Sequence, residues 1–213
     1  MPRLNAGQPI VLSDGTMAPH FRDFLRKMEE NYNNSFGWKD LTRSISSGKV
    51  PPANTPVFTN FGPTATPQRK EYVFVVNDYI YLETFHVNHD IRNAEAYLHV
   101  HWSTNGTSTG NVKWEFSVLR ALGHQQAAFD TVTTITVEAA HMGVAWGHNV
   151  TEVTAPADIL TFTEPDELLL VTLRRVAASS NENANSVFGL TVDLHYYADR
   201  DATPNKSPDF YGG

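Results

Sequence analysis

Residues 85–102 read FHVNHDIRNAEAYLHVHW, and the second half of this stretch decides the fold class. Between residues 96 and 102 polar and apolar side chains alternate. In an extended strand this alternation places His99 and His101 on one face and Trp102 on the other. A strand with one polar and one apolar face is typical of an antiparallel sheet that packs on one side only.

The same kind of segment recurs along the rest of the chain. Short β-branched and aromatic runs are separated by clusters of Asn, Asp, Gly and Pro, which favour turns. Strands are predicted at residues 71–77, 79–86, 96–102, 112–120, 131–138, 148–154, 159–162, 168–176 and 187–197. Eight or nine antiparallel strands predict a mainly β fold, a jelly roll or β-sandwich, over residues 71–200.

An N-terminal arm and one helix, residues 1–35, are predicted ahead of the strands. The short apolar run Ile10, Val11 and Leu12 ends at an Asp-Gly turn signal. After a proline suited to a first helical turn, apolar residues follow the three-and-four spacing of one stripe. The stripe comprises Met17, Phe21, Phe24, Leu25, Met28 and Tyr32. Such a stripe is usually buried in a core; the alternative is that it packs against other copies or a neighbouring shell.

Two further segments are predicted to lie outside the sandwich. Residues 36–70 contain five prolines, which disfavour helices and central strands, so a surface linker or contact arm is expected. Residues 201–213 form a polar tail that carries Phe210 and Tyr211. Each aromatic ring offers about 150–250 Å² to bury, so the tail is expected to dock on a partner.

Composition excludes several classes of protein. The chain has 213 residues and a net charge of −7, which disfavours non-specific nucleic-acid binding. It has no cysteine and therefore neither disulfides nor thiolate metal sites. No apolar window has the length of a signal peptide core or a transmembrane helix, so synthesis and assembly in the cytoplasm, with no membrane partner, are expected.

The histidines of the opening stretch allow two interpretations. His99 and His101 lie side by side on a strand, and a hairpin-like return could bring His86 and His89 beside them to hold zinc. The metal-binding cupins, however, carry a glutamate three or four residues after such a pair, where this chain has Asn105-Gly106. We therefore predict hydrogen-bonded core or interface histidines, with no metal and no other cofactor.

No catalytic site is predicted. The sequence lacks a phosphate-binding glycine loop, a nucleophile elbow and a His-Glu-x-x-His helix. Two carboxylate pairs remain for glycoside hydrolysis by default, Asp166 with Glu167 and Glu83 with Asp90. Asp193 and His195 share a face of the last strand, an arrangement that is common on protein surfaces. No pairing is predicted for His20, His124, His141, His148 or His195.

Several short motifs resemble those of tailed-bacteriophage virion structural proteins. The motifs are Ile10 to Gly15 followed by the Phe-x-x-Phe-Leu helix, Gly37-Trp38-Lys39-Asp40-Leu41, Phe85 to Asp90, His99-Val100-His101-Trp102, Gly110 to Trp114, Asp193-Leu194-His195-Tyr196, and Ala202 to Phe210. One departure is Asn88, where the pattern has proline before the histidine. The resemblance implies a non-enzymatic virion component: a head decoration or cement protein, a fibre piece, or an adaptor. Such domains commonly form trimers.

Three hypotheses follow. The first is a homotrimeric capsid decoration protein that contacts other virion proteins such as the major capsid protein. Its predicted partner-binding residues are Ile10, Val11, Leu12, Phe21, Phe24, Phe210 and Tyr211. The second is a fibre or receptor-binding module whose loops 103–110 and 179–186 contact host glycans. The third is a jelly-roll enzyme with a histidine-bound metal.

Overall fold

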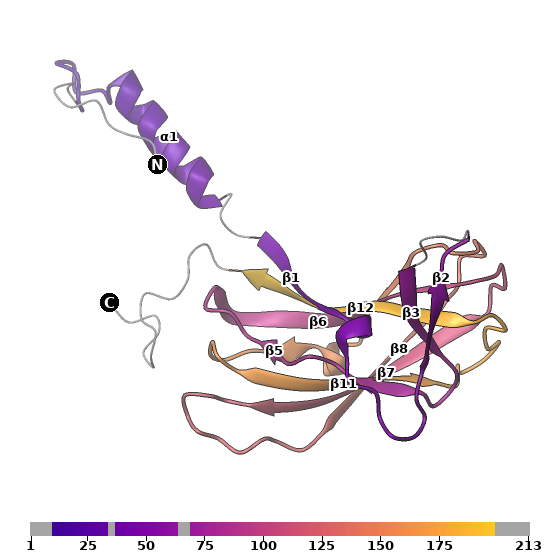
Figure 1. The fold of residues 1–213 in the computed structure, drawn as a ribbon. Coiled ribbons are helices and arrows are strands. Elements are labelled where there is room, and N and C mark those ends of the chain that lie inside the picture. The colour runs from indigo at the N-terminus through magenta and orange to yellow at the C-terminus, as the bar shows by residue number, and fades with distance from the viewer. Residues whose placement is uncertain (1–9, 34–36, 64–68, 199–213) are drawn as a thin grey trace.

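The chain folds into a β-sandwich preceded by one helix. The computed structural model describes residues 10–33, 37–63 and 69–198, and only the backbone of residues 30–33 and 92–94. Two sheets, in which every strand pair is antiparallel, stack face to face, and the helix stands away from them (Figure 1). The predicted mainly β, two-sheet antiparallel sandwich is confirmed.

Each sheet combines segments from distant parts of the chain. The helix α1 spans Pro19–Asn33. The first sheet contains β1 (Gly37–Ser44), β2 (Val57–Phe61), β3 (Arg69–Phe74), β6 (Ile91–Thr104), β9 (Asn149–Glu152), β10 (Leu160–Thr161) and β12 (Val187–Ala198). The second contains β4 (Tyr79–Tyr81), β5 (Phe85–His86), β7 (Asn111–Ala121), β8 (Thr133–Ala140) and β11 (Leu168–Val176). Two 3₁₀ turns are η1 (Ile45–Ser47) and η2 (Pro156–Asp158).

The pairing of β6 with β12 forms the centre of the first sheet. It runs from Val187 opposite Thr104 to Ala198 opposite Ile91, with irregularities after Gly189 and after Tyr196. On its other side β12 pairs first with β3 and then, beyond Gly189, with β1. The edge of β6 that faces away from β12 pairs with β9 and β10. These neighbours give β6 and β12 hydrogen-bonding partners on both edges.

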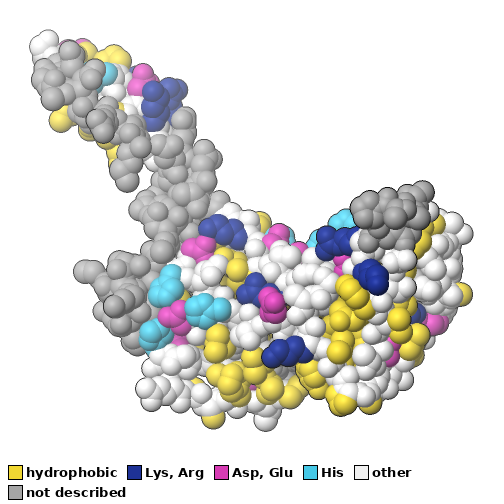
Figure 2. All heavy atoms as spheres, viewed as in Figure 1, with side chains coloured by type: hydrophobic (Ala, Val, Ile, Leu, Met, Phe, Trp, Pro, Cys, Tyr) yellow, Lys and Arg dark blue, Asp and Glu magenta, His cyan; other side chains and the backbone are white. Residues whose placement is uncertain are grey.

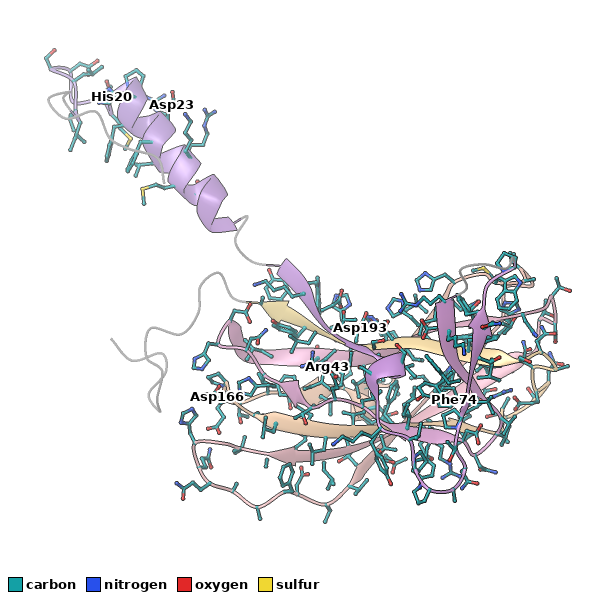
Figure 3. The ribbon with its side chains drawn as sticks, in the orientation of Figure 1. His20, Asp23, Arg43, Phe74, Asp166 and Asp193 are labelled. Carbon is teal, nitrogen blue, oxygen red and sulfur yellow. The ribbon has the colours of Figure 1, made fainter. Side chains whose placement is uncertain are left out.

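The core lies between the two sheets and follows the alternation of the strands. On β7 every second residue from Val112 to Val118 is buried. The largest fully buried side chains include Trp102, Trp114 and Phe74, the last of which is labelled in Figure 3. The indole nitrogen of Trp102 donates to the hydroxyl of Thr151 at 2.8 Å, so this buried polar group keeps a partner.

The prediction of a linker or contact arm over residues 36–70 is wrong. It contains β1, η1 and β2, and both strands belong to the first sheet. The prolines do not prevent this, because β2 lies between Pro56 and Pro63 and forms an edge of the sheet. The predicted strand at 79–86 is also two strands, β4 and β5. Twelve strands therefore occur in the described residues, where eight or nine were predicted.

The predicted helix is confirmed as α1. Before it, Asp14 and Gly15 form a tight turn in which the Thr16 amide donates to the Asp14 carboxylate at 2.9 Å. The apolar stripe is not part of the core: Leu25 is 40% exposed and Met28 is 48% exposed. Ile10, Val11 and Leu12 are exposed as well, and Phe21 and Phe24 are half-buried.

Some of the predicted partner-binding residues lie outside the described residues, namely Phe210 and Tyr211, together with residues 1–9 of the arm. Among the described residues, no helix has the length and apolar character required to span a membrane.

Gly189 is predicted to be essential for packing where β12 changes neighbours. A Cβ atom at this position would lie 2.8 Å from Cδ1 of Ile45 and 3.0 Å from Cε2 of Phe74, both fully buried side chains. Gly189→Ala should therefore lower the free energy of unfolding in urea by about 1–3 kcal/mol. Gly37→Ala is the control, because no heavy atom lies within 4 Å of its Cβ position. Equal stability of the two variants would contradict this account of the packing.

Candidate functional site

The outer face of the first sheet carries a cluster of histidines and carboxylates. The register of β6 with β12 places Asp193 directly opposite His99. On the other edge of β6, the register with β9 places Glu152 opposite the same histidine. Two residues further along β12, His195 lies opposite Asp40 on β1. Because directly opposite residues on one face of a sheet have neighbouring Cβ atoms, four strands contribute to a single cluster. We call these five residues, with His101 and His148, the Asp193 cluster.

Asp193 is the most buried carboxylate of this cluster. Its Oδ2 atom lies 3.1 Å from Nε2 of His99 and 2.9 Å from Nε2 of His101. Asp193 is 6% exposed and His99 is 5% exposed, so this contact is largely shielded from water. Both predicted faces are confirmed: His99 and His101 point away from the buried Trp102, and Asp193 and His195 away from the buried Leu194.

Both imidazoles are also held at their second nitrogen. Nδ1 of His99 lies 3.3 Å from Oε2 of Glu152. Nδ1 of His101 lies 2.6 Å from Nε2 of His148, and the two rings stack with centroids 4.9 Å apart. The orientation of each ring is therefore fixed from the Nδ1 side, with Nε2 directed toward Asp193.

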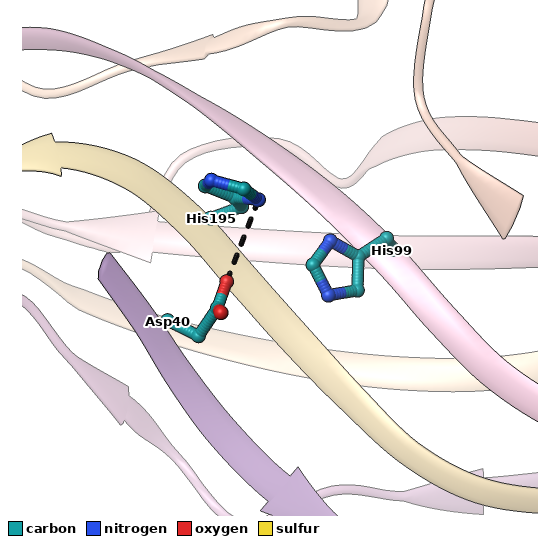
Figure 4. Close-up of side chains that lie close together, drawn as sticks. All are labelled: Asp40, His99 and His195. Carbon is teal, nitrogen blue, oxygen red and sulfur yellow. Dashed lines mark ion pairs between the residues drawn. The ribbon is translucent and has the colours of Figure 1, made fainter. Parts of the chain in front are cut away.

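His195 forms the outer part of the cluster. Its Nδ1 atom lies 3.5 Å from Oδ1 of Asp40 and 3.5 Å from Oε2 of Glu152. Figure 4 shows the ion pair of His195 with Asp40, with the ring of His99 beside them. This part is more open to solvent than Asp193, since the side chain of Asp40 is about half exposed.

The close contacts shift two pKa values in opposite directions. Burial acts to raise the pKa of Asp193, but the adjacent His101 and His99 outweigh it and hold this pKa far below its usual range. Burial acts to lower the pKa of His99, but the hydrogen bonds of Asp193 and Glu152 and the charges of Asp193 and Asp40 outweigh it and raise this pKa above its usual value. In the absence of other ligands, both shifts favour an ionised carboxylate beside a protonated imidazole.

Aromatic side chains border the cluster at the β1 end of the sheet. The Trp38 ring packs edge-on against His195, Tyr97 and Tyr197, with centroids 4.9, 5.8 and 5.5 Å away. Trp38, Tyr97, Glu152 and His195 line a hollow of about 190 Å³. Trp38 is 54% exposed. The hollow therefore presents an aromatic surface next to a carboxylate and an imidazole.

His86 and His89 belong to a different cluster, which corrects the predicted hairpin-like return. The reason is topological: β5 pairs with β11 in the second sheet, whereas His99 and His101 lie on β6 in the first. His86, His89 and His124 each lie within 3.2 Å of a carboxylate oxygen of Asp166. Figure 2 shows histidine side chains gathered around an acidic one at this end of the sandwich, and Figure 3 labels Asp166 there, apart from Asp193.

Three of the four carboxylates that remained for glycoside hydrolysis are engaged in other contacts. Glu167 accepts a hydrogen bond from Nε of Arg120 at 2.5 Å, while Asp166 contacts the histidines described above. Asp90 pairs with Lys39 at 2.5 Å and accepts a hydrogen bond from the Tyr196 hydroxyl at 2.9 Å. These contacts give Asp166, Glu167 and Asp90 structural roles.

The two loops predicted to contact glycans bond to each other. The side-chain amide of Asn183 donates to the carbonyl oxygens of Ser108 and Gly110 at 3.1 and 3.0 Å. The side chain of Asn105 accepts from the Ser186 amide at 3.1 Å. Much of the polar character of residues 103–110 and 179–186 is thus used internally.

The histidines for which no pairing was predicted supply much of the Asp193 cluster. His148 reaches it from the loop before β9, and His195 from the same face of β12 as Asp193. The shared face of Asp193 and His195 was the one signal in the sequence, since residues two apart on a strand point the same way. His141 instead bonds to Thr104 and to the Ser108 carbonyl, which ties the loop after β6 to the loop after β8.

Removing the charge of Asp193 should destabilise the fold more than changing the outer part of the cluster. Asp193→Asn leaves His99 and His101 without their buried anion, and the free energy of unfolding should fall by about 1–3 kcal/mol. His195→Gln, a change at a half-buried ring, should cost less than about 0.5 kcal/mol. Urea unfolding in the presence of a chelator measures both. A smaller loss for Asp193→Asn than for His195→Gln would refute the central place of Asp193.

Comparisons with known proteins give little further guidance. No family model and no curated protein matches the chain. Among solved structures, the chain is similar to the carbohydrate-binding module CBM36 in complex with calcium and xylotriose, with a TM-score of 0.40 and 10% identity. The match covers 72% of this chain and 98% of that one. A similarity of this size says nothing about what the present chain binds.

Proposed function

We propose that the protein is a non-enzymatic structural component of a tailed-phage virion, a head decoration protein that assembles as a homotrimer through α1. The observation that carries the proposal is the apolar stripe of α1, in which Leu25 and Met28 are exposed and Phe21 and Phe24 half-buried, on a helix that stands away from the sandwich (Figure 1). The virion assignment is supported by the resemblance of the motifs at 99–102 and 193–196, which meet across the β6–β12 pairing.

The stripe has the spacing of a helix-to-helix seam. Within α1, Phe21, Phe24 and Met28 are separated by three and four residues, like the a and d positions of a heptad repeat. The rings of Phe21 and Phe24 stack on this side with centroids 6.1 Å apart. A single helix of 15 residues is marginally stable in water, because few hydrogen bonds offset the cost of nucleation.

The occupant that fits this seam best is the same helix of other copies of the chain. A heptad seam packs against an equivalent seam, and the opposite side of α1 is polar, with Asp23 and Arg26 forming an exposed ion pair at 3.3 Å. The resemblance implies that such domains assemble as trimers, so we propose three copies. A trimer of this kind presents three sandwiches around one bundle and leaves their outer faces open to contact a capsid.

The seam is tested by a matched pair of double variants of the full chain. Light scattering should give about three times the chain mass of 23.7 kDa for the wild type. Phe21→Ser with Phe24→Ser should yield monomers, because apolar contacts at a and d positions are lost. The same variant should no longer co-sediment with capsids. Both circular dichroism spectra should retain the strand signal.

The control is Asp23→Ser with Arg26→Ser, which changes the opposite side of α1 and leaves the net charge unaltered. It should stay trimeric and bind capsids. A wild-type chain that is monomeric at high concentration would contradict the trimer. A trimer that never associates with phage particles would contradict the decoration role and leave the seam intact.

A second candidate function, glycan binding by a fibre or receptor-binding module, is favoured by the hollow at Trp38. Exposed aromatic rings stack on the apolar faces of sugars, and Glu152 and His195 beside the ring can bond to hydroxyl groups. This places the candidate surface on the sheet and not on the loops first considered.

Glycan-array binding separates the two candidates. If the hollow binds sugar, Trp38→Ala should abolish binding, while Tyr81→Ala, which removes a similarly exposed aromatic ring from the second sheet, should not. Equal binding by both variants would remove this surface as the glycan site.

A further inference from the structure

The Asp193 cluster contains three ligand atoms in an arrangement suited to a metal ion. Nε2 of His99 and Nε2 of His101 both contact Oδ2 of Asp193, and one ligand atom from each of these three residues lies within 4.8 Å of the other two. The two His–Asp distances of 3.1 and 2.9 Å are close to the separation of ligand atoms in a tetrahedral zinc site, about 3.3 Å for bonds of about 2.0–2.1 Å. The geometry points to a binding site for a divalent transition metal of the zinc class at His99, His101 and Asp193.

Unsatisfied polar atoms give independent support. Nε2 of His101 and Oδ1 of Asp193 are both shielded from solvent, and neither has a hydrogen-bond partner among the described residues. Nε2 of His101 is near Oδ2 of Asp193 but not aligned with it as a hydrogen-bond donor. A buried polar atom without a partner costs about 1–3 kcal/mol. An ion bound to Oδ2 of Asp193 would accept the lone pair of Nε2 of His101 and remove this cost at the imidazole.

Both imidazoles also have what a metal-binding histidine needs at the nitrogen that does not bind the metal, namely a hydrogen-bond acceptor. A histidine that binds a metal through one nitrogen usually donates its other N–H to a carboxylate or another acceptor, which fixes the tautomer and the ring. Glu152 takes this position at Nδ1 of His99, and His148 takes it at Nδ1 of His101. With Nδ1 protonated on both rings, both Nε2 atoms carry the lone pairs that a metal requires.

The ligand types select the class of ion. Two imidazoles and one carboxylate suit zinc and its neighbours better than calcium or magnesium, which prefer oxygen ligands. Three ligands leave one tetrahedral position for water or for a group from a partner. Because β6 supplies two ligands and β12 the third, the ion would join the two central strands of the first sheet.

The cluster offers a second ligand set, Asp40, His99 and His195. Its other two members, Asp40 and His195, lie nearer the solvent than Asp193. His99 would bind there through Nδ1, which shares the carboxylate of Glu152 with Nδ1 of His195. The set with Asp193 is favoured because its carboxylate is buried and has an oxygen without a partner. Variants of His101 and His195 distinguish the two sets.

The test is calorimetric titration of the full chain, without a histidine tag and after chelator treatment, with zinc chloride. The wild type should bind Zn²⁺ at this site with one ion per chain. His101→Gln and Asp193→Asn should each weaken this binding by more than about 100-fold, because loss of an outer partner alone typically costs about 10–100-fold. Glu152→Gln should weaken it by about tenfold or more for the same reason.

Two matched controls each remove an imidazole that does not contact Asp193. His195→Gln changes the second ligand set, and His86→Gln changes the cluster around Asp166. Both should keep the affinity of the wild type. Loss of binding in His195→Gln with retention in His101→Gln would assign the ion to Asp40, and loss in His86→Gln alone would assign it to Asp166; either result overturns the proposal.

A measurement on the wild type needs no variant and so does not depend on whether a variant folds. Nitrogen-15 NMR of the imidazoles should show Zn²⁺ bound at Nε2 of His99 and His101, with the proton on Nδ1 of each ring. Thermal unfolding should shift upward with Zn²⁺ in the wild type and not in His101→Gln. Imidazole signals that do not change with added Zn²⁺ would refute the site. The outcome is independent of the role of α1, so trimer formation and metal binding can fail separately.

Discussion

The pairing of β6 with β12 is the constraint on which both faces of the first sheet depend. Its register sets Leu98 opposite Leu194 and Val100 opposite Val192, and these four side chains are buried in the core. The same register sets His99 opposite Asp193 on the outer face. Because side chains alternate with a period of two, a slip of one residue would exchange the two faces. The apolar core therefore holds the polar cluster in place.

This coupling explains how an ionic cluster is maintained on a sheet surface. Bringing Asp193 and His99 out of water costs free energy, and a buried ion pair alone seldom repays it. Here the strands are already fixed by the packing of Trp102, Trp114 and their neighbours, so the ion pairs need not position the chain. The outer face is free to serve a binding role, and the helix, outside the sandwich, is free to serve assembly.

The sequence allowed the fold to be predicted much further than the site. Alternation marked eight strands at about the right places, because the sandwich buries one face of each, and a ninth segment, 79–86, proved to be the two strands β4 and β5. It missed β1 and β2, since edge strands such as Val57–Phe61 bury few side chains and lie among prolines.

The Asp193 cluster was harder to predict because it joins four segments that are distant in sequence. The pair His99 and His101 was visible as a motif, and Asp193 with His195 as a shared face. Which of them meet depends on the order and register of the strands, and alternation alone does not specify either. His86 illustrates this, because its neighbour in space, Asp166, is reached only through the pairing of β5 with β11.

The connection of α1 to β1 has a mechanical consequence. The chain leaves the helix and enters β1 at Gly37, and all eight residues of β1 pair with β12 from Ala198 to Thr191. If tension is applied to the helix along the axis of β1, those pairs are loaded in shear and resist together, whereas a perpendicular pull would open them one after another. The direction of the applied force would then decide how firmly the sandwich stays tethered.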